Sequence, residues 1–170
     1  MRKASHGFAD QAAMVLPVLG TVLLTILMAS AVFAPVRFLP VIWITMVFFW
    51  RLYSPATMPY GWVFSIGLLH DALLGLPLGM HALALLIGAL ILERMARNIM
   101  RQTFRMVWMG LVFFVVCVFS MTGLLAIVMG TSINLKLFIV QALATMVFYP
   151  LVHALLSRCA RLLPPSSLRG

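Results

Sequence analysis

The sequence predicts an all-α integral membrane protein with about six transmembrane helices and with both termini in the cytoplasm. Two observations support this prediction: the composition and the placement of the basic residues. Of the 170 residues, 64% are hydrophobic and only 9% are charged, and the mean hydropathy is +1.14. Soluble domains carry roughly 25% charged residues, so a soluble chain of this composition would expose large apolar patches. A bilayer removes that difficulty, and at this length we expect a single domain, residues 1–170.

Six apolar segments are long enough, or nearly long enough, to cross a bilayer as helices. A crossing needs about 20 apolar residues, and about 17 are tolerated. The predicted helices lie near 11–34, 37–53, 60–76, 78–97, 106–130 and 134–157. Proline and glycine residues mark the turns between them. The second segment is the shortest purely apolar stretch, so it could be tilted, short or re-entrant.

The distribution of lysine and arginine predicts the orientation of these helices. Six crossings place alternate loops on opposite sides, and ten of the 12 basic residues then fall on one side. That side holds Arg2, Lys3, Arg51, Arg94, Arg97, Arg101, Arg105, Arg158, Arg161 and Arg169, and the other holds Arg37 and Lys136. Because cytoplasmic loops are enriched in Lys and Arg, both termini are expected inside. The net charge of +9 therefore needs no nucleic-acid partner.

Aromatic residues cluster around the second segment and its exit. They are Trp43, Trp50, Tyr53, Tyr60 and Trp62. Tryptophan and tyrosine are enriched where a membrane meets water, so we expect these side chains at headgroup level.

Asp71 is the most informative single residue, because it interrupts the apolar segment near 60–76. An ionised carboxylate in hydrocarbon is unfavourable by at least ~2.5 kcal/mol, so it must face a partner, a polar cavity or the interface. Gly67, Asp71 and Gly75 recur every four residues, which places them on one face of a helix. Small residues at that spacing let a second helix approach closely, and Asp71 would then lie in the contact. Gly79 falls beyond the next proline, so we assign it to the turn.

Two interpretations of Asp71 are open. In the structural interpretation, which we favour, Asp71 is a hydrogen-bonding clamp between helices. In the functional interpretation it relays protons or binds a polar ligand together with His70 or His81. A relay needs a chain of ionisable groups through the membrane. The only candidates near Asp71 or deep in the predicted helices are His70, His81 and His153. Because His70 lies about 100° around the helix from Asp71, we expect each histidine to be a satisfied polar residue or an interfacial anchor.

The remaining charged groups also have structural interpretations. Glu93, the only glutamate, precedes Arg97 by four residues, the favourable order for an ion pair on a helix. Four arginines form one basic stripe if the fourth helix continues past the membrane: Arg94, Arg97, Arg101 and Arg105. This cytoplasmic basic face sets topology and attracts anionic membrane lipids, docks an acidic partner, or does both. Since no catalytic motif is present, we expect a non-enzymatic protein without catalytic residues, cofactor or metal.

The middle of the chain carries a pattern that resembles a known family. Residues 67–83 read GLLHDALLGLPLGMHAL, with a glycine, an aspartate four positions on, and then Gly and Leu-Gly before a helix of small residues. Matching residues in the other helices are Pro40-Val41-Ile42-Trp43, Phe49-Trp50 and Tyr149-Pro150. On these residues the chain resembles the rod shape-determining protein MreD family, whose members are small proteins of the bacterial inner (cytoplasmic) membrane.

The resemblance implies a function in cell elongation and rod shape. Members of the family are non-enzymatic scaffolds that act with the bitopic membrane protein MreC. Through it they act with the MreB filament, the RodA polymerase and a penicillin-binding transpeptidase of peptidoglycan synthesis. The family's fold is also similar to the substrate-binding subunits of vitamin importers. The alternative expectation is therefore a small-molecule transporter or substrate-binding membrane subunit with Asp71 in a polar cavity, although the internal repeats typical of transporters are not evident.

Overall fold

The chain folds into α-helices, as a computed structural model describes for residues 2–29, 41–100, 104–131 and 134–161. Side chains are described for 15–29, 41–96, 104–131 and 134–160. The elements are α1 (Arg2–Ala29), α2 (Ile42–Tyr53), α3 (Tyr60–Leu73), α4 (Met80–Met100), α5 (Phe104–Val128) and α6 (Leu135–Arg161). No strand occurs in these ranges. The prediction of an all-α chain with six helices is confirmed.

The predicted helix boundaries agree best for the last four helices. α1 begins at Arg2, nine residues before the apolar segment, because polar residues can continue a helix beyond its apolar part. The predicted residues 30–34 and 37–40 lie outside the part of the chain that the structure describes. α2 is only 12 residues long, which corresponds to about 18 Å. It is therefore short, one of the outcomes that its sequence left open.

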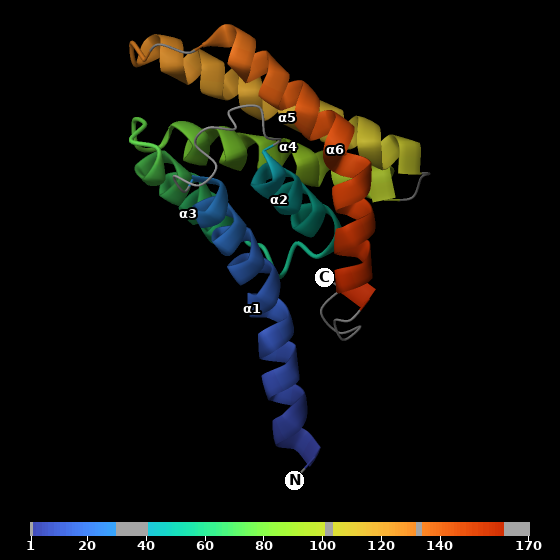
Figure 1. Ribbon diagram of the computed structural model, residues 1–170. Helices are drawn as coiled ribbons and strands as arrows, with labels where there is room; N and C mark the ends of the chain where they lie inside the picture. The colour runs from blue at the N-terminus through green and yellow to red at the C-terminus, as the bar shows by residue number, and fades with distance from the viewer. Residues whose placement is uncertain (1, 30–40, 101–103, 132–133, 162–170) are drawn as a thin grey trace.

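Within the part of the chain that the structure describes, two helices are long and apolar enough to cross a membrane, judged by length and composition alone. They are Phe104–Val128, which is the whole of α5, and Leu135–Ala160 of α6. α6 contains Pro150 and bends along its length in Figure 1. A proline inside a helix removes one backbone hydrogen bond and clashes with the preceding turn, which accounts for the bend.

The short helix α2 lies at the centre of the molecule, in contact with α1, α4, α5 and α6 (Figure 1). Its buried residues include Trp43, Phe48 and Trp50, which are 1%, 0% and 4% exposed. Trp43 and Trp50 therefore belong to the core and are not part of an exposed aromatic belt. Trp62 is 49% exposed, as expected of a residue on the surface.

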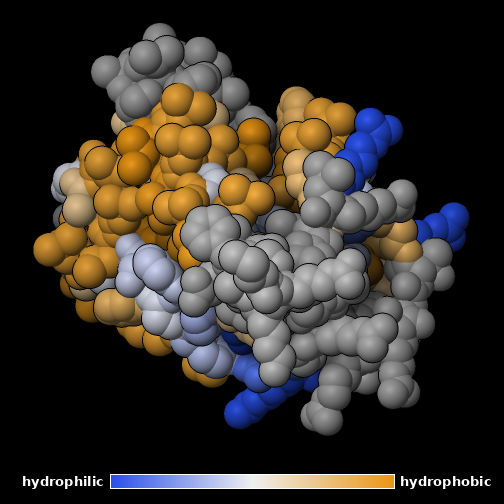
Figure 2. Space-filling model, turned by 90° about the horizontal axis from the view of Figure 1, so that it is seen from below, coloured by the Kyte–Doolittle hydropathy of each residue, from blue (hydrophilic) through white to orange (hydrophobic). Residues whose placement is uncertain are grey.

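Large apolar side chains also cover the outside of the molecule. The most exposed lie on α1, α5 and α6 and in the turn before α4: Leu16, Leu23, Leu78, Ile127, Val128, Leu135, Val147, Leu151 and Leu155. Figure 2 shows one such face, where hydrophobic residues extend over a broad area and hydrophilic residues gather towards one side. Exposed apolar surface of this extent marks contact with a membrane or with another protein.

A left-handed glycine turn ends α3. Gly75 has a φ of +63°, and the N–H groups of Gly75 and Leu76 donate to the carbonyls of Ala72 and Asp71 at 3.4 and 2.9 Å. This is the Schellman pattern, which glycine favours because it lacks a Cβ. Gly75 is exposed and a Cβ there would meet nothing within 4 Å. The expectation that Gly75 lies in the helix contact is wrong, whereas Gly79, with a φ of +99°, lies in the turn as expected.

The close approach of α3 and α4 occurs at Gly67. A Cβ at this position would lie 2.5 Å from Cα and 2.7 Å from the backbone nitrogen of Ala82. Real Cβ atoms do not come so near to backbone, so only glycine lets the two helices pack at this distance. Small residues on both helices thus fix how the end of α3 meets the start of α4.

We expect Gly67→Ala to lower the free energy of unfolding by about 1–3 kcal/mol, because the added methyl group must push α4 away. The measurement is thermal unfolding of the purified variant in detergent. Gly61→Ala is the matched control on the same helix: its Cβ would meet nothing within 4 Å. Alanine is the better helix former, so this control should be neutral or stabilising by up to about 1 kcal/mol. Equal effects of the two substitutions would contradict the close contact.

Candidate functional site

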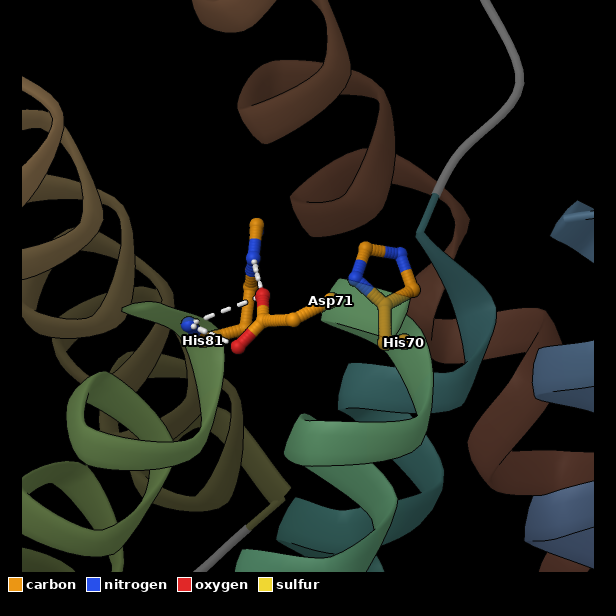
Figure 3. A group of neighbouring side chains, drawn as sticks. All are labelled: His70, Asp71 and His81. Atoms are coloured by element: carbon orange, nitrogen blue, oxygen red, sulfur yellow. Dashed lines mark hydrogen bonds and ion pairs between the residues drawn. The ribbon is translucent and has the colours of Figure 1, made fainter. Parts of the chain in front are cut away.

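Asp71 on α3 is fully buried and binds the beginning of α4 (Figure 3). Its Oδ2 accepts hydrogen bonds from the backbone N–H groups of Gly79 and His81, both at 3.0 Å. The first N–H groups of a helix have no partner within the helix, so a carboxylate there satisfies donors that would otherwise be unpaired. The partial positive charge of the helix N-terminus also favours an anion. Asp71 therefore caps α4 from the neighbouring helix.

His81, in the first turn of α4, adds a side-chain contact to the same carboxylate. Its Nδ1 lies 2.7 Å from Oδ1 of Asp71, and its side chain is 14% exposed. The hydrogen bond or ion pair between the two groups connects α3 with α4 a second time. This arrangement is the clamp that the structural interpretation of Asp71 describes.

His70 lies beside this pair, against expectation. Its ring packs against the ring of Trp43, with centroids 4.5 Å apart, and against that of His81, at 4.6 Å. Its Nδ1 is buried without a hydrogen-bond partner, so of the two expected environments, a satisfied polar residue or an interfacial anchor, the first does not hold for this atom of His70. One potential ligand atom from each of His70, Asp71 and His81 lies within 4.8 Å of the others.

From the sequence, a site formed by Asp71 with His70 or His81 was the less favoured interpretation, because only the angle between His70 and Asp71 on one helix was considered. The turn at 74–79 brings His81 back over both residues, so the third member comes from α4. The signal was the pair His-Asp followed ten residues later by a histidine, across a turn that contains two glycines and a proline. The expectation that the protein binds no metal came from the sequence alone, before the proximity of His70, Asp71 and His81 was known.

The cluster adjoins a cavity of about 270 Å³. The cavity lies where α3 and α5 end and α4 and α6 begin. Its polar lining consists of His70, His81, Thr122, Thr131, Asn134 and Gln141, and the remaining lining residues are apolar. The hydroxyl of Thr122 is buried and, like Nδ1 of His70, has no hydrogen-bond partner. The cavity thus has two polar groups available to a ligand.

A second polar cluster lies at the opposite ends of these helices. Arg51 of α2 is 6% exposed; its guanidinium donates to Oε2 of Glu93 and to the carbonyl of Met58, both at 3.2 Å. The hydroxyl of Tyr60 also donates to Glu93, and the guanidinium lies 4.2 Å from the centre of the Tyr60 ring. Arg51 was expected to be a loop charge that sets topology; it is a buried residue that joins three helices.

The remaining predicted basic and acidic residues have different outcomes. Arg94 on α4 and Arg105 on α5 are exposed. Because α4 ends at Met100 and Arg105 belongs to α5, the four arginines do not form one helical stripe. The side chain of Arg97, the expected partner of Glu93, and all of Arg101 lie outside the described residues.

His153 on α6 has the expected structural environment. Its Nε2 lies 3.2 Å from the hydroxyl of Tyr53. Its ring packs against Phe49, Phe104 and Tyr149, with centroids 5.2–5.6 Å apart. His153 is far from the cavity in the fold, because Tyr53 lies at the end of α2 that is opposite to Trp43.

No protein-family model, curated protein or solved structure matches the chain. Inferences about its function therefore come from the residue pattern and from the geometry described above. That geometry favours binding and helix–helix contact: a carboxylate and two imidazoles gathered at a helix start, beside a partly polar cavity.

We expect Asp71→Leu to lower the free energy of unfolding by about 3–5 kcal/mol, because it leaves His81 and two buried N–H groups without their acceptor. Asp71→Asn keeps one acceptor oxygen and should lower it by only about 1–3 kcal/mol. The control is Ser65→Ala on the same helix, where the exposed hydroxyl bonds only to Gly61. Unfolding in detergent measures all three. Similar stabilities of the leucine variant and the control would contradict the capping function of Asp71.

Arg51→Ala should lower the free energy of unfolding by about 1–3 kcal/mol, because it removes a buried side chain that bonds to the Met58 carbonyl and packs on the Tyr60 ring. Arg94→Ala, which changes an exposed arginine one residue after Glu93, should change it by no more than about 0.5 kcal/mol. Chemical unfolding curves of the two variants, recorded in the same detergent, make the comparison. If both variants are as stable as the parent, the Arg51 cluster does not hold the three helices together.

Proposed function

We propose that the protein is a non-enzymatic scaffold of the bacterial inner membrane that supports rod-shaped growth, as the resemblance to the MreD family implies. The observation that supports it most is the distribution of side chains. The charged side chains pair within the bundle: Asp71 of α3 with His81 of α4, and Arg51 of α2 with Glu93 of α4. Bulky apolar side chains cover the outside of α1, α5 and α6. A protein built in this way contacts its partners mainly through apolar helix faces within the bilayer.

In this proposal all six helices lie in the membrane and both termini face the cytoplasm. The two polar clusters lie at opposite ends of the bundle, which supports alternating directions for the helices. The cavity end contains the turns after α3 and α5. The other end contains the end of α2, the start of α5 and the later part of α6, which meet at Tyr53, Phe104 and His153. The exposed Arg94 and Arg105 belong to this second end, which we assign to the cytoplasm.

The short helix α2 fits this proposal because other helices surround it. At about 18 Å it is shorter than the roughly 30 Å hydrocarbon core. Non-helical backbone at membrane depth is tolerated only where protein buries it. The connection that follows α2 meets this condition in part: Ser54, Thr57 and Met58 are at most 3% exposed, whereas Ala56 and Pro59 are exposed.

The proposed partners follow from the same surfaces. The apolar helix faces would contact a bitopic membrane protein of the MreC type. Arg94 and Arg105, both exposed, would face anionic lipids or acidic groups of cytoplasmic components. Through these contacts the scaffold would act indirectly with an MreB filament, a RodA polymerase and a penicillin-binding transpeptidase of peptidoglycan synthesis.

A second candidate function is supported by the cavity. Its 270 Å³ and its polar lining, including His70 and His81, are compatible with a small ligand. A substrate-binding membrane subunit or transporter would use such a space. The two candidates differ in what a cell loses when the protein is removed: its shape or the uptake of a compound.

Depletion of the protein in its bacterial host should convert rods into round cells, because a missing scaffold disperses the elongation machinery. Expression of the parent chain should restore rods, Asp71→Asn should restore them partly, and Asp71→Leu should fail. Microscopy of cell shape and co-purification of the MreC-type partner are the two measurements, with immunoblots of membrane fractions to match protein amounts. Ser65→Ala should behave as the parent.

One outcome would overturn the scaffold proposal, and another would overturn the function assigned to the α3–α4 contact. Depleted cells that keep their rod shape but lose uptake of a nutrient would favour the transporter. Unchanged co-purification of the partner with both Asp71 variants would show that the α3–α4 contact does not shape the partner surface.

A further inference from the structure

The buried Nδ1 of His70 needs an explanation, because polar atoms without a partner are rare in protein interiors. His70 follows an apolar stretch of α3 and packs between Trp43 and His81. In Figure 3 a ring nitrogen of His70 faces the side on which Asp71 and His81 lie. A leucine or methionine would fill this position without an unpaired nitrogen. The imidazole is therefore better explained by a ligand than by packing.

We propose that His70, Asp71 and His81 form a binding site for a divalent transition-metal ion of the zinc class, at the edge of the cavity. One ligand atom of each residue lies within 4.8 Å of the others. Ligand atoms about 2.1 Å from a tetrahedral Zn²⁺ lie roughly 3.4 Å apart. Side-chain rotations that bring the most distant ligand atoms up to about 1.4 Å nearer, and that separate the 2.7 Å pair of His81 Nδ1 and Asp71 Oδ1 by about 0.7 Å, therefore complete the ligand set.

The surroundings of the three residues are those of a supported metal site. Oδ2 of Asp71 accepts the N–H groups of Gly79 and His81, which hold the carboxylate in place while Oδ1 turns to the ion. In the absence of the ion, Nδ1 of His81 and Oδ1 of Asp71 share a hydrogen bond of 2.7 Å. The ion takes the place of that hydrogen. Hydrogen bonds to the other carboxylate oxygen orient a metal ligand and increase affinity.

The ligand types decide which ions the site prefers. Two imidazoles and one carboxylate suit Zn²⁺, Co²⁺, Ni²⁺ or Cu²⁺, whereas Mg²⁺ and Ca²⁺ prefer sets made only of oxygen. Three protein ligands leave a fourth position open towards the cavity. A water or a small ligand there can donate to or accept from the cavity wall, where the Thr122 hydroxyl also has no partner. One ion accounts for the buried Nδ1 of His70, and its fourth ligand would lie in the cavity that Thr122 also lines.

The site does not depend on the proposed scaffold function. It would fasten the turn at 74–79 to both helices, in addition to the hydrogen bonds already present. A protein that scaffolds nothing could still bind the ion, and a scaffold could lack it. The test therefore uses the metal alone and the purified protein.

Titration of the full chain in detergent with Zn²⁺, after treatment with a chelator, should show saturable binding of one ion per chain by calorimetry. Co²⁺ should give the visible absorption bands of a four-coordinate site, and excess Mg²⁺ should not remove them. His70→Ala and His81→Ala should each weaken Zn²⁺ binding by at least tenfold. His153→Ala is the matched control, since that histidine binds Tyr53 elsewhere in the fold, and it should bind as the parent.

His70→Ala decides the question, because His70 contributes nothing to the cap of α4 and the variant should fold as the parent does. Its unfolding temperature without metal should fall modestly, because the ring no longer packs against Trp43 and His81, and the increase on adding Zn²⁺ should disappear. No saturable binding to the parent chain would overturn the proposal. Binding that is unchanged in His70→Ala would overturn it as well, because the ion would then lie elsewhere.

Discussion

The carboxylate of Asp71 is the interaction on which the arrangement of this protein depends. It satisfies backbone N–H groups at the start of α4, pairs with His81 and lies one turn from the closest contact between α3 and α4. A buried anion is unfavourable by itself, and here the donors at the helix start offset that penalty. The turn at 74–79 is consequently held at both ends, and with it the cavity that the cluster adjoins.

Periodicity and composition were sufficient to predict the helices, because apolar runs separated by glycine and proline have few alternatives. The pattern also indicated that Gly67 and Asp71 would face a neighbouring helix. It failed for Gly75, since the spacing of four residues continued past the point where α3 ends. A stripe of small residues predicts a helix contact only as far as the helix extends. A left-handed glycine such as Gly75 can end the helix although it continues the spacing of four residues.

Which residues lie in the interior of the bundle was harder to predict than the order of the helices along the chain. Trp43, Trp50 and Arg51 have the residue types of an interface with water, yet each is less than 7% exposed. The sequence of α2 could not show this, because burial of a short helix depends on four neighbours from distant parts of the chain. His70 was misjudged for the same reason: its relation to His81 is created by a turn, and angles around one helix do not report on the next helix.

The central position of α2 has a consequence for the order in which the chain can assemble. The N–H of Val41, just before α2, donates to the hydroxyl of Thr145 on α6 at 2.9 Å, across 104 residues of sequence. Phe48 of α2 likewise packs against the ring of Tyr149. Since chains are synthesised from the N-terminus, α2 cannot make all its native contacts until α6 has been synthesised. The core is thus complete only after synthesis of the last helix, and in a chain stalled on the ribosome before that point the side of α2 that contacts α6 would remain uncovered.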